Sequence, residues 1–298
     1  MASFASGSRR ARGACAAVCR LGIRRQNEWR LRLSESLSDW LALREPADFA
    51  ARSAALTRAV VDALPRRRPL RILDLATGTG ANVRYLARFL PPDHKWLLVD
   101  RDPELLAEAS RRTAAMMAVD TKCFDLGPLD RPEIFANRDF VTASALLDLV
   151  SERWLRDLAE RCRAARAAVL FALTYNGRSQ CSPVEPEDDA IRELMNRHQR
   201  ANDKGFGRAA GPDAVDRAER CFAAAGYVMT REPSDWVLPS EMHALQRELI
   251  EGWAEAAAEI APEESAMIQS WRVRRQDHVA QNRSRIVVGH DDLGGWLP

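Results

Sequence analysis

The sequence predicts an α/β protein whose core is a doubly wound, mostly parallel sheet of seven strands. Between positions 70 and 173, short apolar runs alternate with helical patterns of about 10–15 residues. A glycine-rich turn follows the first apolar run, and helical segments precede the sheet and interrupt it after the fifth and sixth strands. Such alternation requires right-handed crossovers and a sheet covered by helices on both faces.

The elements of the first half follow from periodicity and punctuation. Apolar residues at helical spacing predict helices over 28–64, interrupted at Pro46 and ended by Pro65. Pro103 suits the first turn of a helix, where its missing N–H costs nothing. The expected strands are 70–75, 96–100, 119–124, 140–143 and 167–173, with helices over 81–90, 103–117 and 151–165 between them.

In the second half of the sequence, the regular alternation of strands and helices ends. Residues 175–211 are polar, contain one helix over 187–200 and are too long for a simple connection, so we expect a lid over the site. The remaining expected elements are helices over 212–226, 240–260 and 263–281 and strands over 227–238 and 285–289. The predicted organisation is a tail (1–27), N-terminal helices (28–66) and one domain (67–298) with insertions at 175–211 and 240–281.

Composition argues against several classes of partner. The formal net charge is only +2, and arginine supplies nearly all the positive charge, a sign of coding bias that discounts individual arginines. No basic stripe suggests nucleic acid, and no apolar run reaches the roughly 18–20 residues of a membrane span. The six cysteines form no CxxC pair, so we expect a reduced, cytoplasmic protein without a metal site. The oligomeric state stays open.

The first 27 residues contain six arginines and no acid, which is the composition of a mitochondrial transit peptide. An overlong gene start and a disordered basic tail are the alternatives. We expect a cytoplasmic location, with the mitochondrion as the alternative.

The most informative segment is the turn after the first strand, where Asp74 precedes Gly78 and Gly80. Glycines there let the backbone approach a ligand at the carboxyl end of the sheet. A dinucleotide-binding turn would need glycine or alanine at position 83, which is Val83, and a P-loop would need a Gly-Lys-Ser/Thr sequence. The turn therefore suits an uncharged sugar or an amino-acid group rather than a pyrophosphate.

On these residues the chain resembles the class I S-adenosylmethionine-dependent methyltransferase superfamily, whose first motif is an acid followed by Gly-x-Gly. The resemblance continues at Asp100, about 20 residues further on, where such folds place an acid that accepts the ribose hydroxyls. It implies a Rossmann-like fold with S-adenosylmethionine as cofactor. The implied cofactor-binding residues are Asp74, Ala76, Thr77, Gly78, Gly80, Asn82, Asp100, Arg101, Asp125 and Ser144.

Two of these residues have a second interpretation. Asp125, which the resemblance places near the adenine amino group, is also suited to form a turn before Gly127. Asp74 lies in an apolar strand and needs partners, either the amides of the glycine turn or the amino group of the ligand.

Methyl transfer is an in-line displacement, so the main task of the protein is to align acceptor and methyl group at roughly 3–3.5 Å. A general base is needed only for an acceptor that starts protonated. The candidates for catalysis are His198, Asp148 and Tyr175, with a helix N-terminal carboxylate as the alternative role of Asp148. The candidates for acceptor binding are Asn176, Arg178 and Lys204.

The class of acceptor is not fixed by these residues. The end of the fourth strand (144–148) lacks the Asn/Asp-Pro-Pro-aromatic tetrad of amino-methylating enzymes, which favours a small-molecule acceptor. The alternatives are an RNA or protein methyltransferase, an inactive nucleoside-binding regulatory or assembly protein, and a nicotinamide-dependent enzyme.

Overall fold

The computed structural model describes residues 37–66, 69–201, 203 and 205–298. The chain divides into two compact units, Met1–Ala42 and Leu43–Pro298. Of the first unit only residues 37–42 are described, and they are helical. The expectations for the tail (1–27) and for residues 28–36 lie outside the described residues. Residues 43–66 belong to the same unit as the sheet.

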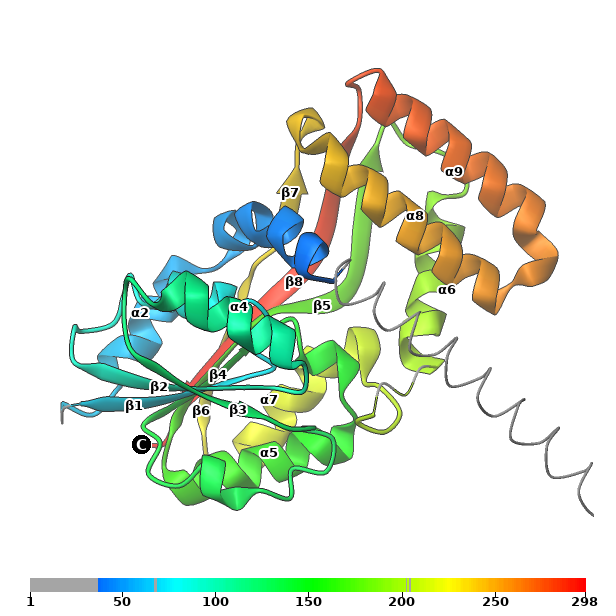
Figure 1. The fold of residues 1–298 in the computed structure, drawn as a ribbon. Helices are drawn as coiled ribbons and strands as arrows, with labels where there is room; N and C mark the ends of the chain where they lie inside the picture. Colours follow the sequence, from blue (N-terminus) through cyan, green and yellow to red (C-terminus); the bar gives the residue numbers. More distant parts are fainter. Residues whose placement is uncertain (1–36, 67–68, 202, 204) are drawn as a thin grey trace, which may run out of the picture. The chain divides into compact units, whose positions relative to one another are not determined.

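The sheet has eight strands in the order β3-β2-β1-β4-β5-β8-β6, and β7 also pairs with β8 (Figure 1). The parallel part contains β1 (Leu70–Leu75), β2 (His94–Asp100), β3 (Val119–Cys123), β4 (Phe140–Ser144) and the start of β5 (Ala168–Ser182). The antiparallel part contains β6 (Val228–Pro233), β7 (Trp236–Leu238) and β8 (Arg285–Trp296). The predicted doubly wound, mostly parallel arrangement is confirmed.

The predicted count of seven strands was one too low, because the expected strand over 227–238 is two strands. The ladder breaks beside His290, where Ser234 N donates to the His290 carbonyl at 2.9 Å. His290 N then donates to a side-chain oxygen of Asp235, at 3.0 Å, instead of to a backbone carbonyl. A side chain thus replaces the backbone acceptor at this point and separates β6 from β7.

Helices cover both faces of the sheet, as Figure 1 shows for α2 and α4 on one side and α5 and α7 on the other. Alternate strand residues supply the two cores: Ile72 packs with α2 (Ala54–Asp62), α3 (Ala81–Leu86) and α4 (Pro103–Thr113). Leu73 belongs to the opposite cluster, with α5 (Glu152–Ala165) and α7 (Ala214–Ala224). This division follows from the period of two along a strand.

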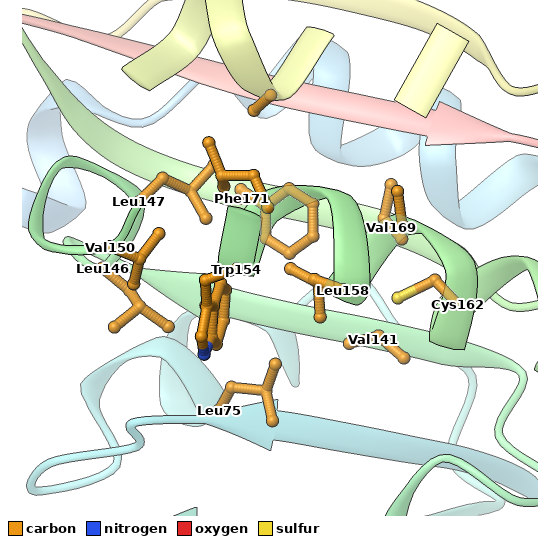
Figure 2. Close-up of a cluster of buried hydrophobic side chains, with 14 of the residues drawn as sticks. Leu75, Val141, Leu146, Leu147, Val150, Trp154, Leu158, Cys162, Val169 and Phe171 are labelled. Carbon is orange, nitrogen blue, oxygen red and sulfur yellow. The ribbon is translucent and has the colours of Figure 1, made fainter. Parts of the chain in front are cut away.

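The second core centres on Trp154 of α5, which Figure 2 shows among Leu75, Val141 and Phe171. The indole N–H of Trp154 donates to the carbonyl of Leu126 at 2.8 Å, so the one polar atom of this side chain is paired. The helix that carries it begins at Ser151, whose hydroxyl accepts from Trp154 N at 3.3 Å.

Strand β5 continues well past Leu173, where the sequence analysis ended it. Residues 175–182 were predicted to open a lid, and that prediction was wrong: Tyr175 pairs with His290 and Cys181 with Ile286. The sequence analysis expected no strand here because the stretch is polar. Its backbone pairs with β8, which is far away in the sequence, and the pairing contains two register shifts. Strand β8 likewise runs to Trp296, beyond the predicted end at residue 289.

The extended β5–β8 pair carries α6 (Asp188–Ala201), α8 (His243–Ile260) and α9 (Ser265–Ala280), which Figure 1 shows grouped together. An ion pair joins two of them: Arg275 of α9, whose side chain is fully buried, binds the carboxylate of Asp188 at the start of α6. The indole N–H of Trp271 donates to the same carboxylate at 2.8 Å. Among the described residues, no helix is both long and apolar enough to cross a membrane.

Candidate functional site

The turn after β1 has a backbone that most side chains would strain. Ala76, Gly78 and Gly80 all have positive φ, at 50°, 52° and 78°. A Cβ at Gly80 would lie 3.2 Å from the Cβ of Ala109 in α4, so the turn packs closely against the neighbouring helix. Thr77 N donates to the carbonyl of Val99 at 3.0 Å, which fixes the turn to the end of β2.

Asp74 is fully buried at the base of this turn. Its carboxylate accepts from the hydroxyl of Thr77 and from the side-chain amide of Asn82, the latter at 2.6 Å. Burial raises the pKa of Asp74 to about 7, against the effect of these two hydrogen bonds and of Arg52. The partners of Asp74 in this structure are therefore side chains of the turn and of α3, where the sequence analysis expected the turn amides. The other expected partner, the amino group of a ligand, stays a prediction.

Asp100 ends β2 beside the turn. One carboxylate oxygen accepts from Gly78 N at 2.8 Å, and the other accepts from Asp102 N at 3.1 Å. Burial raises the pKa of Asp100, and the backbone donors oppose that rise. The two features that the resemblance combined, a glycine turn and an acid at the next strand end, are thus in direct contact.

Two charged residues that the sequence analysis did not select complete this site. Arg52, immediately before α2, donates from Nη1 to the side-chain oxygen of Asn82 at 2.5 Å, and its guanidinium lies 4.2 Å from the ring centroid of Tyr85. Asp292 of β8 lies 3.9 Å from Arg52 Nε. The sequence analysis did not select Arg52 because it discounted individual arginines as signals. It did not select Asp292 because it ended the last strand at residue 289, whereas β8 continues to Trp296.

The other cofactor-binding candidates are placed as follows. Ser144 ends β4 and is half-buried, whereas Arg101 is exposed directly after β2. Asp125 is exposed and accepts from Gly127 N at 2.9 Å. In this structure Asp125 forms the turn, which is the second of its two predicted roles.

The three catalytic candidates lie in different surroundings. The hydroxyl of Tyr175 donates to the side-chain oxygen of Asn196 at 2.8 Å, and burial raises the pKa of this phenol, which disfavours ionisation. His198 lies on α6, with Nε2 2.9 Å from Glu259 of α8. Asp148 is buried in the short 3-10 helix η2 (Leu147–Leu149) that follows β4.

The acceptor-binding candidates are only partly described. Asn176 donates to Asp291 of β8 at 2.7 Å, and Arg178 pairs at 3.1 Å with Asp235, which lies between β6 and β7. Lys204 lies outside the described residues.

His290 is a further residue that the sequence analysis missed. Its ring lies between Tyr175 and Trp236, with centroid distances of 6.1 and 5.0 Å. Burial lowers the pKa of His290 to about 3, so the imidazole is neutral at pH 7. Because Nδ1 is 3.1 Å from the Val288 carbonyl, Nδ1 carries the proton. No periodic signal marks a single histidine in a strand, and only the pairing of β8 with β5 reveals its position.

The described residues also limit the chemistry. Within the described ranges, no group of three or more His, Cys, Asp or Glu side chains is arranged to hold a metal ion. The charged and polar groups around the glycine turn belong to one connected set, which contains Arg52, Asp74, Thr77, Asn82 and Asp292. This set presents both hydrogen-bond donors and acceptors beside the turn.

One family model and several solved structures are similar to this chain. Residues 72–167 match the family model described as a methyltransferase domain. No curated protein matches the chain. Similar solved structures include the cyclopropane synthase MmaA2 from Mycobacterium tuberculosis, at 12% identity over 80% of this chain and 82% of that one, with a TM-score of 0.42.

Two further similar structures come from other bacteria. The YcgJ protein from Bacillus subtilis is 13% identical over 83% of this chain and 100% of that one, with a TM-score of 0.47. An S-adenosylmethionine-dependent methyltransferase from Thiobacillus denitrificans, in complex with S-adenosylhomocysteine, is 14% identical over 83% of this chain and 93% of that one, with a TM-score of 0.41.

Proposed function

Because residues 72–167 form a methyltransferase domain of the class I S-adenosylmethionine-dependent superfamily, we propose that the chain transfers the methyl group of S-adenosylmethionine to a small-molecule acceptor. The observation that carries the cofactor assignment is the 2.8 Å hydrogen bond from Gly78 N to the carboxylate of Asp100. It joins a glycine backbone that a ligand can approach to an acid suited to ribose hydroxyls.

The residues of the site fit this cofactor part by part. Asp100 is the acceptor for the ribose hydroxyls. The turn around Gly78 is the surface for the sugar and the sulfonium side, because glycine leaves no Cβ in the way. Asp74 and its partners form the polar end of the site, which suits the amino-acid part. When bound, the cofactor supplies an electrophilic methyl group with a good leaving group.

The described residues favour catalysis by positioning. Tyr175 is held as a neutral phenol by Asn196, and His198 is engaged by Glu259 on α8. The raised pKa of Tyr175 disfavours the phenolate that would remove a proton from an acceptor. Alignment and exclusion of water are sufficient for an acceptor that is already nucleophilic. An acceptor nitrogen, sulfur or carbon of that kind is consistent with this site.

The choice of a small molecule is supported by charge and by the end of β4. The net charge of +2 provides little general attraction for a polyanion. Ser144 and Ala145, at the end of β4, stand where amino-methylating enzymes carry their Asn/Asp-Pro-Pro-aromatic tetrad. An RNA or protein acceptor is the alternative that the experiment below separates.

The function is tested in two steps. Calorimetric titration of the full chain with S-adenosylmethionine, S-adenosylhomocysteine and NADH should give binding of the first two only. Incubation with methyl-labelled cofactor and separate metabolite, RNA and protein fractions should then label the metabolite fraction, and D100N should reduce the label strongly when the cofactor is limiting. Binding of NADH instead would overturn the cofactor assignment. Label in the RNA or protein fraction alone would overturn the acceptor class, and binding without any label would indicate a regulatory protein.

A further inference from the structure

His290 has one ring nitrogen that makes no hydrogen bond within the described ranges. Nδ1 carries the proton and donates to the Val288 carbonyl at 3.1 Å, so Nε2 presents a lone pair. The residue is only 6% exposed, yet Nε2 itself is not fully buried, so a ligand can reach it. Buried polar groups in proteins are nearly always paired, and an open acceptor in such a place is suited to bind a donor group.

Two further aromatic side chains lie beside this imidazole. Tyr175 pairs directly with His290, and Trp236 pairs with Val288, two residues before it, so all three rings project from one face of the sheet. The hydroxyl of Tyr175 donates its proton to Asn196 at 2.8 Å, which leaves lone pairs on the phenol oxygen. The ring cluster (Tyr175, Trp236 and His290) therefore combines flat apolar faces with hydrogen-bond acceptors.

The ring cluster lies next to the proposed cofactor site. His290 and Asp292 project from the same face of β8, two residues and therefore roughly 7 Å apart along the strand. Asp292 lies 3.9 Å from Arg52, and Arg52 donates to Asn82 beside the glycine turn. A methyl acceptor has to lie beside the cofactor, so the ring cluster is in the region where an acceptor binds.

The charges around the ring cluster disfavour an anionic ligand. Asp48 accepts from Trp236 Nε1 at 3.0 Å and pairs with Arg44, whose guanidinium lies 4.8 Å from the Trp236 ring centroid. Burial, with Arg44 as a smaller cause, lowers the pKa of His290 to about 3, so the imidazole supplies no positive charge. A carboxylate or phosphate would meet the lone pairs of Nε2 and of the Tyr175 oxygen, whereas an N–H or O–H group would be bound by them.

We propose that the ring cluster binds the methyl acceptor and that Nε2 of His290 accepts a hydrogen bond from it. The acceptor is then an uncharged ring compound with an N–H or O–H donor. Its ring packs against Tyr175 and Trp236, and its donor is oriented by Nε2. The inference rests on the proposed function and narrows the small-molecule acceptor to this chemical class.

The test uses two ring compounds that differ only in the donor. Indole has an N–H group, and benzofuran has an oxygen atom in the same position. The full chain is first saturated with S-adenosylhomocysteine, so that neither probe enters the cofactor site, and each probe is then titrated by NMR. Indole should bind at least fivefold more tightly, because only its N–H can use Nε2. Equal affinity, or binding of neither probe, would overturn the inference.

The nitrogen spectrum of the histidine side chains locates the contact. The chain contains five histidines, and the Nε2 signal of His290 is the one that H290Q removes. Indole should shift this signal saturably toward the position of a hydrogen-bonded nitrogen, and benzofuran should leave it unchanged. Binding of indole without that shift would place the probe elsewhere and overturn the assignment to His290.

A phenylalanine variant separates binding from a structural role. H290F keeps an aromatic ring and removes both nitrogens. It should weaken indole binding at least fivefold and change the affinities for benzofuran and S-adenosylhomocysteine less than twofold. H243F is the matched control, because His243 is exposed at the start of α8. Equal weakening of both probes by H290F would show a purely structural His290 and overturn the inference.

The failure of this inference and the failure of the proposed function have different signatures. If the wild-type chain does not bind S-adenosylhomocysteine, the proposed function itself fails. If it binds S-adenosylhomocysteine but does not distinguish indole from benzofuran, only the inference about the ring cluster fails. This comparison needs no variant, so it stays decisive if H290F does not fold.

Discussion

The buried carboxyl of Asp74 makes a sharp prediction about pH. Its pKa of about 7 in the folded protein lies above the ordinary value of 3.8, since burial outweighs its hydrogen bonds. The charged groups that face it are Arg52, which lowers the pKa, and Asp100, which raises it. A group whose folded-state pKa is raised binds protons more strongly when folded. The contribution of Asp74 to the free energy of unfolding must therefore increase as the pH falls through 7.

The size of this change in stability follows from the linkage between proton binding and folding. Between pH 8 and pH 6 the unfolded chain keeps Asp74 ionised, while the folded protein takes up most of one proton. The contribution of this carboxyl to the free energy of unfolding then rises by about 1.4 kcal/mol over that interval. D74N removes the titration and keeps the shape, because the amide can accept from Asn82 and donate to Thr77 in place of the carboxylate.

Urea unfolding at pH 6, 7 and 8 measures this difference. All other titratable groups are common to both proteins, so the comparison of wild type with D74N isolates residue 74. The wild type should gain about 1.4 kcal/mol relative to D74N on going from pH 8 to pH 6. Identical pH dependence in the two proteins would refute the argument. Saturating S-adenosylhomocysteine should reverse the trend, because a bound ammonium group favours the ionised carboxyl, so ligand affinity should rise with pH.

Three further predictions concern the glycine turn, Asp100 and the ion pair between α9 and α6. D100N should weaken S-adenosylhomocysteine binding at least tenfold by calorimetry, since a charge-assisted hydrogen bond contributes about 1.5–3 kcal/mol; unchanged affinity with an unchanged circular dichroism spectrum would place the ribose elsewhere. G80A should lower the free energy of unfolding by about 1–2 kcal/mol, because φ is 78° and Ala109 lies 3.2 Å from the new Cβ; a neutral effect in urea would contradict the packing of the turn. R275L should lower it by about 3 kcal/mol by leaving the carboxylate of Asp188 without its buried cation, and unchanged protease resistance of α9 would count against that ion pair.

The parallel half of the fold was predictable because its signals are local. Ile72 and Leu73 are both fully buried although they point to opposite faces, as expected for a central parallel strand. The glycine turn and Asp100 were predictable for the same reason, since each directly follows an apolar strand. The contact between them then follows from the parallel pairing of β1 with β2.

The antiparallel half was less predictable because its strands are polar. Residues such as Asn176 and Asp291 resemble a loop in the sequence, yet they form part of the β5–β8 pair and bond to one another at 2.7 Å. Tyr175 and Ser179, on either side of a register shift, pair with His290 and Val288 of a strand more than a hundred residues away. No periodicity within either segment indicates such a partner. His290 and Asp292 were missed because they lie on this strand.

Arg52 shows why the candidate site includes residues that lie outside its sequence motif. The arginine lies before the sheet, and Asp292 lies on its last strand, yet the same backbone fixes both. Ser53, the next residue, caps α2 by accepting from Leu56 N and also donates its own N–H to Asp292 at 3.0 Å. Leu173 N holds the other oxygen of Asp292, so that carboxylate is positioned by α2 and β5 together. The start of one helix thereby places a cation beside the glycine turn, and this placement depends on the final fold rather than on any local pattern.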